Sequence, residues 1–173
     1  MGNIAVNRTT NANVYLNGNS LLGKVSEATA PTIKTKFADV EALGLVGSFE
    51  LPSGLDKMEL KLKFNAIYPD VAAACSNPFE THEIQIRGSV ETYTAGGRVS
   101  QVPSVIYVRG TFKDNALGNY KQHQNVDLGA DMNVTAVKHE VDGVSLLDID
   151  VLANVWKVKG VDILAQYRQN IGA

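Results

Sequence analysis

The segment Glu83–Asp114, EIQIRGSVETYTAGGRVSQVPSVIYVRGTFKD, sets the fold class of this chain. Two long runs of alternating side chains flank the sequence AGGR, whose glycines are typical of a hairpin turn. In the second run, Ile106 and Val108 lie on one face of the predicted strand, while Val105 and Tyr107 lie on the other. Apolar groups on both faces indicate that both faces are covered, either by the protein's own elements or by another subunit.

Further strands are predicted on both sides of this segment. Val14–Val25 contains Asn17-Gly18, a strong hairpin signal, and a second turn falls at Asp142-Gly143. Met58–Phe64, MELKLKF, alternates apolar and charged residues and gives the clearest strand pattern. Because strands are not separated by regularly spaced helices, a parallel α/β fold is excluded. The sequence predicts an antiparallel meander of roughly seven to nine strands.

Two short helices complete the predicted fold. The mid-chain stretch YPDVAAACSNP places Pro69 at a first helical position, and Asn77-Pro78 ends the helix. Near the end of the chain, Asp162–Ile171 carries an apolar stripe, with Asp162 as the expected cap. We expect this stripe to dock on the chain's own β-core near a subunit boundary, or else to cover the core without touching a neighbour. The fold class is therefore mainly β: an antiparallel β-sandwich or partial barrel with one mid-chain helix and a short C-terminal helix.

Length and composition indicate one soluble domain over residues 13–173, preceded by a polar N-terminal arm over residues 1–12. The net charge of −2 gives no basic footprint for strong nucleic-acid binding. A single cysteine, Cys75, excludes an intrachain disulfide and a cysteine-based zinc site, and is expected to be a small buried side chain. No apolar run is long enough for a membrane anchor, and the N-terminus has no signal-peptide pattern. The chain is thus expected in a cytosolic setting.

The sequence offers no constellation for chemistry. The three histidines are scattered, and no other ligand lies at metal spacing. Asp148 and Asp150 share a strand face, which fits an acid–base pair but fits a solvated or turn-facing pair better. We therefore predict that the chain is not an enzyme and has no catalytic, cofactor-binding or metal-binding residues.

Gly44–Asp56 is punctuated by glycines and is predicted to be an extended loop or hairpin. Phe49 and Leu51 lie between its turn residues. The glycines keep such a segment mobile in a free subunit, while the two apolar side chains give it something to bury on a neighbour.

Several motifs, in order, resemble one family. GVDILAQYRQNIG resembles the C-terminus of the major tail tube proteins of contractile-tailed bacteriophages and R-type pyocins, in which a Gly-Val-Asp-x-Leu helix closes the chain. VYLNGNSLLG, APTIKTK, ALGLVGS, VRGTFKD and VDGVSLLDID resemble other landmarks of that family. The resemblance extends from Asn13 to Ala173.

The resemblance implies a structural virion protein rather than an enzyme. Six copies would close into a ring, and rings would stack into a hollow tube inside a contractile sheath. The implied partners are other copies of the chain, the tail sheath protein, a baseplate tube initiator, and the tape measure protein followed by DNA in the lumen, without specific binding. The implied place is the virion tail, assembled in the cytoplasm of a bacterial host. Alternatives are the tube of a headless tailocin or other contractile injection system, and a soluble β-sandwich binding module.

Two groups of residues are the expected sites of assembly. The subunit interface is expected at Phe49, Leu51, Gln166 and Arg168. A neutral to acidic lumen, which would not hold back a polyanion, is expected at Gln85, Ser89, Glu91, Asn133 and Thr135.

Overall fold

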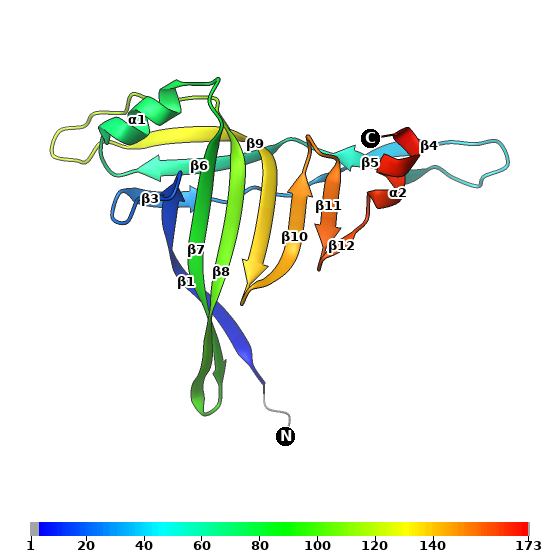
Figure 1. The fold of residues 1–173 in the computed structure, drawn as a ribbon, viewed down its shortest axis with the longest axis horizontal. Helices are drawn as coiled ribbons and strands as arrows, with labels where there is room; N and C mark the ends of the chain where they lie inside the picture. The colour runs from blue at the N-terminus through cyan, green and yellow to red at the C-terminus, as the bar shows by residue number, and fades with distance from the viewer. Residues whose placement is uncertain (1–3, 173) are drawn as a thin grey trace.

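A long antiparallel sheet forms the centre of the computed structural model, which describes residues 4–172 (Figure 1). Its strands follow the order β12-β11-β10-β9-β8-β7-β1-β2. The segment Glu83–Asp114 forms the β7–β8 hairpin, as its sequence predicts. The bounds of the strands are Val6–Leu16 (β1), Asn19–Ser20 (β2), His82–Thr94 (β7), Gly97–Phe112 (β8), Leu128–Val141 (β9), Val144–Asp150 (β10), Val155–Val158 (β11) and Val161–Asp162 (β12).

A second layer covers part of one face of this sheet. It consists of β3 (Val25–Thr29) and β6 (Met58–Phe64), which pair with each other. Strand β6 also pairs with the first half of β9, whereas the second half of β9 pairs with β10 in the long sheet. A register shift at Thr135 separates the two halves, and such a bulge bends a strand. The sheet therefore folds over itself into a partial sandwich, and the mainly β fold class is confirmed.

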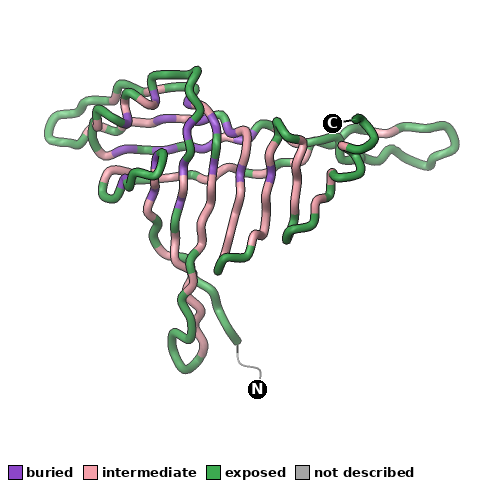
Figure 2. The backbone as a smooth tube through the Cα atoms, viewed as in Figure 1, coloured by how far each residue is buried: buried purple, intermediate pink, exposed green. Residues whose placement is uncertain are grey.

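The hydrophobic core lies between the two layers, where buried residues concentrate (Figure 2). The alternation in Met58–Phe64 is confirmed, because its four apolar residues are all buried and the residues between them are not. They share the core with Ile84, Val108, Met132, Val137 and Ile149 of the long sheet. The far ends of the long strands extend beyond this core and are half-buried or exposed (Figure 2).

The predicted turns and the mid-chain helix are confirmed. Asn17 and Gly18 both have positive φ, 48° and 83°, as a two-residue type I′ hairpin requires. Helix α1 (Pro69–Ser76) begins at the proline and ends before Asn77. Cys75 is buried as expected, and burial raises the pKa of its thiol to about 12.

The stretch expected to be an N-terminal arm contains regular structure. Strand β1 begins at Val6, which lies opposite Tyr93 near the tip of the β7–β8 hairpin. The strand continues past Ala12 without a break, with one register shift after Thr10. Residues 1–3 of the expected arm and Ala173 at the other end lie outside the described residues.

The prediction for the C-terminal helix is partly wrong. Asp162 belongs to β12, and helix α2 (Ala165–Ile171) begins three residues later than expected. None of its residues is buried, and Ile163, Tyr167 and Ile171 are each about half exposed. The docking on the chain's own core is therefore contradicted. The physical reason is position: α2 follows the last strand and lies beyond the end of the core (Figure 1).

Candidate functional site

A separate two-stranded hairpin extends away from the sandwich, past β12 (Figure 1). It consists of β4 (Thr35–Val40) and β5 (Phe49–Leu55). The expected segment Gly44–Asp56 supplies the second strand of this hairpin, and its partner β4 lies outside the predicted bounds. In its register Val40 lies opposite Phe49, and Ala38 lies opposite Leu51. Directly opposed residues of a ladder point to the same side. The hairpin therefore has one entirely apolar face: Ala38, Val40, Phe49 and Leu51.

This apolar hairpin face is open to solvent. Phe49 and Leu51 are 47% and 49% exposed, and Leu43 and Val46 at the tip are fully exposed. A two-stranded hairpin is marginally stable by itself, and exposed apolar surface of this kind marks an interaction site. The structure thus brings together the two predicted interface residues of this segment.

The same hairpin is acidic. Asp39, Glu41 and Glu50 carry its charge, and no basic residue occurs between Phe37 and Leu55. At the base of the hairpin, Lys36 pairs with Asp56 at 3.4 Å. Because Asp39 lies opposite Glu50, these two carboxylates point to the side of the hairpin away from Phe49 and Leu51.

A second apolar surface surrounds α2. We define the α2 surface as Val161, Ile163, Tyr167 and Ile171, each between 51% and 67% exposed. Lys159, in the turn before β12, is exposed beside it. Lys157 points to the other side of the sheet, because it lies opposite Asp148 and Asp162 whereas Val161 lies opposite Val158.

The two predicted interface residues on α2 behave differently. Gln166 is exposed, and its only side-chain hydrogen bond among the described residues goes to Asn170 on the same helix. Arg168 faces its own chain: it bonds Asp162 through Nη2 and donates from Nη1 to the carbonyl oxygen of Asn154 at 2.7 Å. Arg168 therefore holds α2 in place, and Gln166 is the outward position.

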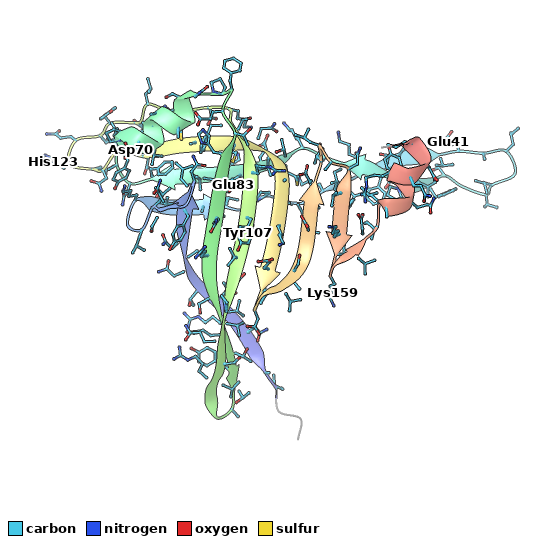
Figure 3. All side chains as sticks on the ribbon, viewed as in Figure 1. Glu41, Asp70, Glu83, Tyr107, His123 and Lys159 are labelled. Atoms are coloured by element: carbon cyan, nitrogen blue, oxygen red, sulfur yellow. The ribbon has the colours of Figure 1, made fainter. Side chains whose placement is uncertain are left out.

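The face of the long sheet opposite the core is uncovered and polar. Gln85 of β7, Tyr107 of β8 and Lys138 of β9 lie side by side on it, and Figure 3 shows Tyr107 there, near Glu83 of the neighbouring strand. Two of its cations have carboxylate partners: Arg109 pairs with Asp150, and Lys138 pairs with Glu140 at 2.7 Å, which raises the pKa of Lys138. Arg87 on the same face donates to Gln85 Oε1 at 2.8 Å. We call this surface the open face.

The structure brings the five predicted lumen residues to the side of the sheet away from the core. Gln85, Ser89 and Glu91 alternate along β7, and Asn133 lies opposite Thr111 on the same side of β8. Thr135 is the bulged residue, and its hydroxyl donates to the carbonyl oxygen of Arg109. They form a track rather than a cluster. Their partners on β8 extend from Gln101 to Thr111, ten residues that correspond to about 33 Å of strand.

The long sheet ends in two unlike edges, which sequence reasoning did not locate. Strand β2 covers β1 only at Tyr15 and Leu16, so among the described residues the outer edge of Val6–Asn13 has no strand partner. At the other end, β12 pairs with β11 and with no other strand in the described part of the chain. Little in the sequence indicated the first edge, because Val6–Ala12 is mostly polar and does not alternate apolar with polar residues.

Catalytic and metal chemistry find no support within residues 4–172. No group of three His, Cys, Asp or Glu residues there is placed to hold a metal ion. Asp148 and Asp150 share the open face, and Asp150 accepts the backbone N–H groups of Leu152 and Ala153, so it is turn-facing as expected. None of the described helices is long and apolar enough to span a membrane.

Comparisons with known proteins agree with the resemblance in the sequence. Residues 7–172 match the family model described as phage tail tube protein FII. Over 164 residues the chain is 29% identical to the tail tube protein of Escherichia phage P2, covering 92% of this chain and 94% of that protein. The fold is also similar to a cryo-EM structure of an extracellular contractile injection system, the PVC sheath/tube terminator in its extended state. That match has a TM-score of 0.55 and 9% identity over 75% of this chain and 92% of the other, which shows a shared fold alone.

Proposed function

Because this chain belongs to the phage tail tube protein FII family, we propose that six copies of it close into a ring and that these rings stack into the inner tube of a contractile tail or related injection system. Membership of a structural tail tube family confirms that the chain is not an enzyme. The tube would serve as a rigid conduit that a shortening sheath drives through a target envelope and through which DNA then passes.

The two unlike edges of the long sheet carry the proposal. In a cyclic ring the contact is heterologous: one surface of each subunit meets a different surface of the next. The outer edge of β1 and the edge of β12 are such a pair, since within residues 4–172 neither edge has a strand partner on its outer side. Pairing them around a ring would join the six sheets into one closed barrel, which removes every exposed edge.

The open face is the surface best suited to line the lumen. The opposite face carries the core and the second layer, so it points outward in a closed barrel. The track from Gln85 to Glu91 on β7 and the ion-paired groups around Arg109 would then border the bore. Because Arg109 and Lys138 are paired with carboxylates, and Glu83 and Asp148 add negative charge to the same face, this lining would be close to neutral, and a polyanion would pass without being held.

Partners other than the chain itself follow from the same family assignment. The layer formed by β3, β6 and α1 would face the sheath protein outside the tube. A baseplate initiator would start the first ring, and the tape measure protein would precede DNA in the lumen. The protein would be a component of the virion tail, assembled in the bacterial cytoplasm.

Negative-stain microscopy of the purified chain, together with sedimentation, tests the proposal. We expect six-fold rings and tubes of variable length at micromolar concentration. An interface of this obligate kind buries upwards of ~2,000 Å², so rings should persist on dilution. Featureless monomers across that range, in the presence of an assembled baseplate complex as well as in its absence, would contradict the proposal and favour a soluble binding module.

A further inference from the structure

His82, the first residue of β7, is the only buried polar side chain among residues 4–172, with 2% of its surface exposed. Its ring packs on that of Phe112, with 5.5 Å between the two ring centroids. On one side, Nδ1 lies 3.0 Å from Nδ2 of Asn17, the first turn residue after β1. On the other side, Nε2 is buried and has no hydrogen-bond partner in the described part of the chain. The fold therefore encloses an imidazole whose polar contact is with Asn17.

Asn17 determines which protonation state of that ring fits. Its Oδ1 accepts the backbone N–H of Glu83 at 2.9 Å, so its Nδ2 is oriented toward His82 and can only donate. Nδ1 of His82 must therefore accept. A neutral imidazole can do so, whereas an imidazolium carries a proton on both nitrogens and cannot. Rotating the amide of Asn17 does not resolve the conflict, because Nδ2 would then face the N–H of Glu83.

We propose that Asn17 and His82 form an acid-sensitive latch, which holds the start of β7 to the β1–β2 turn while His82 is neutral and opens when His82 takes up a proton. In the closed chain a proton on Nδ1 would face the N–H of Asn17 across 3.0 Å, donor against donor. The charge would also lie in the core, where an unpaired ion is costly. Opening removes both penalties, because the ring then reaches water.

The position of the latch allows it to open without unfolding the sandwich. His82 begins its strand, and residues 77–81 before it are all exposed. Asn17 lies in a two-residue turn, and β2 beyond the turn pairs with β1 only at Tyr15 and Leu16 among the described residues. Glu83, the neighbour of His82, lies toward the end of β7 that follows α1 (Figure 3). The strand end and the turn can therefore separate while most of the β7–β8 ladder stays paired.

No carboxylate is placed to stabilise a charged His82 in the closed chain. The β1–β2 turn offers Asn17, β8 offers Gly110 and Phe112, and α1 offers Cys75, whose thiol is kept neutral because burial raises its pKa to about 12. The charged residues of β6 alternate with its buried ones and point away from the core. The remaining charged residues of the adjoining segments are all exposed: Glu80, Glu83, Arg109, Lys113 and Asp114.

His139 has the opposite arrangement and supplies the control. Its Nε2 lies 3.1 Å from the hydroxyl oxygen of Ser104. A hydroxyl can donate or accept, so it suits the neutral ring and the charged ring alike. Proton uptake by His139 therefore breaks no contact of this kind.

The latch lies at the end of β1, the strand whose outer edge would meet β12 of the next copy in the proposed ring. A subunit with an open latch would present that edge poorly, so mild acid would disfavour assembly. This consequence rests on the proposed function. The latch itself is a property of one chain and is tested on free subunits.

Hydrogen exchange followed by mass spectrometry, corrected for the intrinsic pH dependence, tests the latch between about pH 7.5 and about pH 5. The open chain binds one proton more than the closed chain, so the opening constant of residues 15–22 and 80–84 should rise as the pH falls. One proton gives at most a ~10-fold rise per pH unit, below about pH 6.5, where an imidazole in water becomes charged. Carboxylates with a lowered pKa keep their charge in this range: Asp56, Glu59, Glu91 and Asp162.

Two variants decide whether His82 carries the response. His82→Gln leaves a side chain that is neutral at every pH and offers Asn17 an amide oxygen, so opening should no longer depend on pH. Asn17→Asp supplies a carboxylate oxygen that accepts from the charged ring, while the other oxygen still accepts the N–H of Glu83. In that variant the opening constant should fall, instead of rise, as the pH is lowered toward about pH 6. His139→Gln should respond like the parent.

A parental opening constant that stays unchanged over this pH range would overturn the latch. So would an undiminished response in His82→Gln, or a response that disappears in His139→Gln. If His82→Gln does not fold, Asn17→Asp decides, since a rise in its opening constant with acid, as in the parent, contradicts the proposal. None of these results bears on the proposed tube, which microscopy tests separately.

Discussion

Asp162 accepts three hydrogen bonds that together attach helix α2: Arg168 donates from Nη2 to Oδ2 at 2.6 Å and from Nη1 to Oδ1 at 3.4 Å, and the backbone N–H of Leu164 donates to Oδ1 at 3.0 Å. The carboxylate of Asp162 thus links β12 to α2 through an ion pair with Arg168 and through a hydrogen bond from the backbone of Leu164. The chain's own apolar core does not hold this helix. Its attachment should therefore respond to charge more than to core packing.

The attachment of α2 should weaken in acid. Arg168, and after it the N–H of Leu164, lowers the pKa of Asp162 below its ordinary value of 3.8. A lowered folded pKa means that the stabilisation is fully present above about pH 3.8 and is lost as the pH falls through the lower folded pKa. Amide hydrogen exchange in α2, corrected for its intrinsic pH dependence, should accelerate in that range. Asp162→Asn, which keeps an acceptor but not the charge, should exchange faster at neutral pH and lose the acid dependence. An unchanged pH profile in that variant would contradict the role of the pair.

A truncation in the core should change folding stability, whereas an acidic substitution on the hairpin should change assembly. Leu60 is completely buried, so Leu60→Ala should lower the free energy of unfolding by ~2–5 kcal/mol. Leu51→Asp changes a half-exposed side chain and should stay within ~0.5 kcal/mol of the parent, yet rings should no longer stack. Denaturant titration of the dissociated subunit and microscopy measure the two effects. A parental yield of tubes from Leu51→Asp would show that the hairpin face is not an assembly surface.

Asn17 should matter more than its exposed turn suggests. Its Oδ1 accepts the N–H of Glu83, so its Nδ2 points at Nδ1 of the buried His82, 3.0 Å away. Nδ1 then accepts, and the neutral ring carries its proton on Nε2. Asn17→Ala should cost ~1–3 kcal/mol of unfolding free energy, because it removes partners from both groups. Asn19→Ala, on the exposed side of the same turn, is the matched control. Nitrogen chemical shifts of His82 that place the proton on Nδ1 would contradict the assignment.

Cys75 should be inert while the chain is folded. Burial raises the pKa of its thiol to about 12, and Asp114 contributes in the same direction. Since only the thiolate is a good nucleophile, iodoacetamide at neutral pH should label the unfolded chain and not the folded one. The raised pKa also means that stability declines as the pH rises from about 9, where the unfolded chain loses this proton, towards 12. Rapid labelling under native conditions, followed by mass spectrometry, would disprove this.

The lumen assignment predicts protection that depends on tube length. Gln85→Cys should react readily with a maleimide bearing a large polymer in free subunits, and progressively less as tubes lengthen and access is restricted to their ends. Gln122→Cys, in the exposed loop between β8 and β9, should react in both states unless the sheath covers it. Equal labelling of both positions in long tubes would place the open face outside.

Most elements of the fold could be predicted from the sequence, because they depend on short-range patterns. The β7–β8 hairpin, the strand Met58–Phe64 and helix α1 follow from side-chain alternation, from the positive φ that Asn17-Gly18 accepts, and from a proline at a helix start. These signals act over a few residues, so they need no knowledge of the rest of the chain. The ordered motifs likewise indicated the family.

Only the tertiary structure decided what each surface meets. The apolar stripe of the C-terminal helix predicted that one side of the helix is buried. In the structure α2 lies beyond the core, and Arg168 points toward its own chain and bonds Asp162. Likewise, Ala38 and Val40 join the face of Phe49 and Leu51 only through the register of β4 with β5. The polar residues from Val6 to Ala12 form a strand only because β7 supplies partners for their backbone. Such contacts join residues far apart in the chain, and no short-range pattern encodes them.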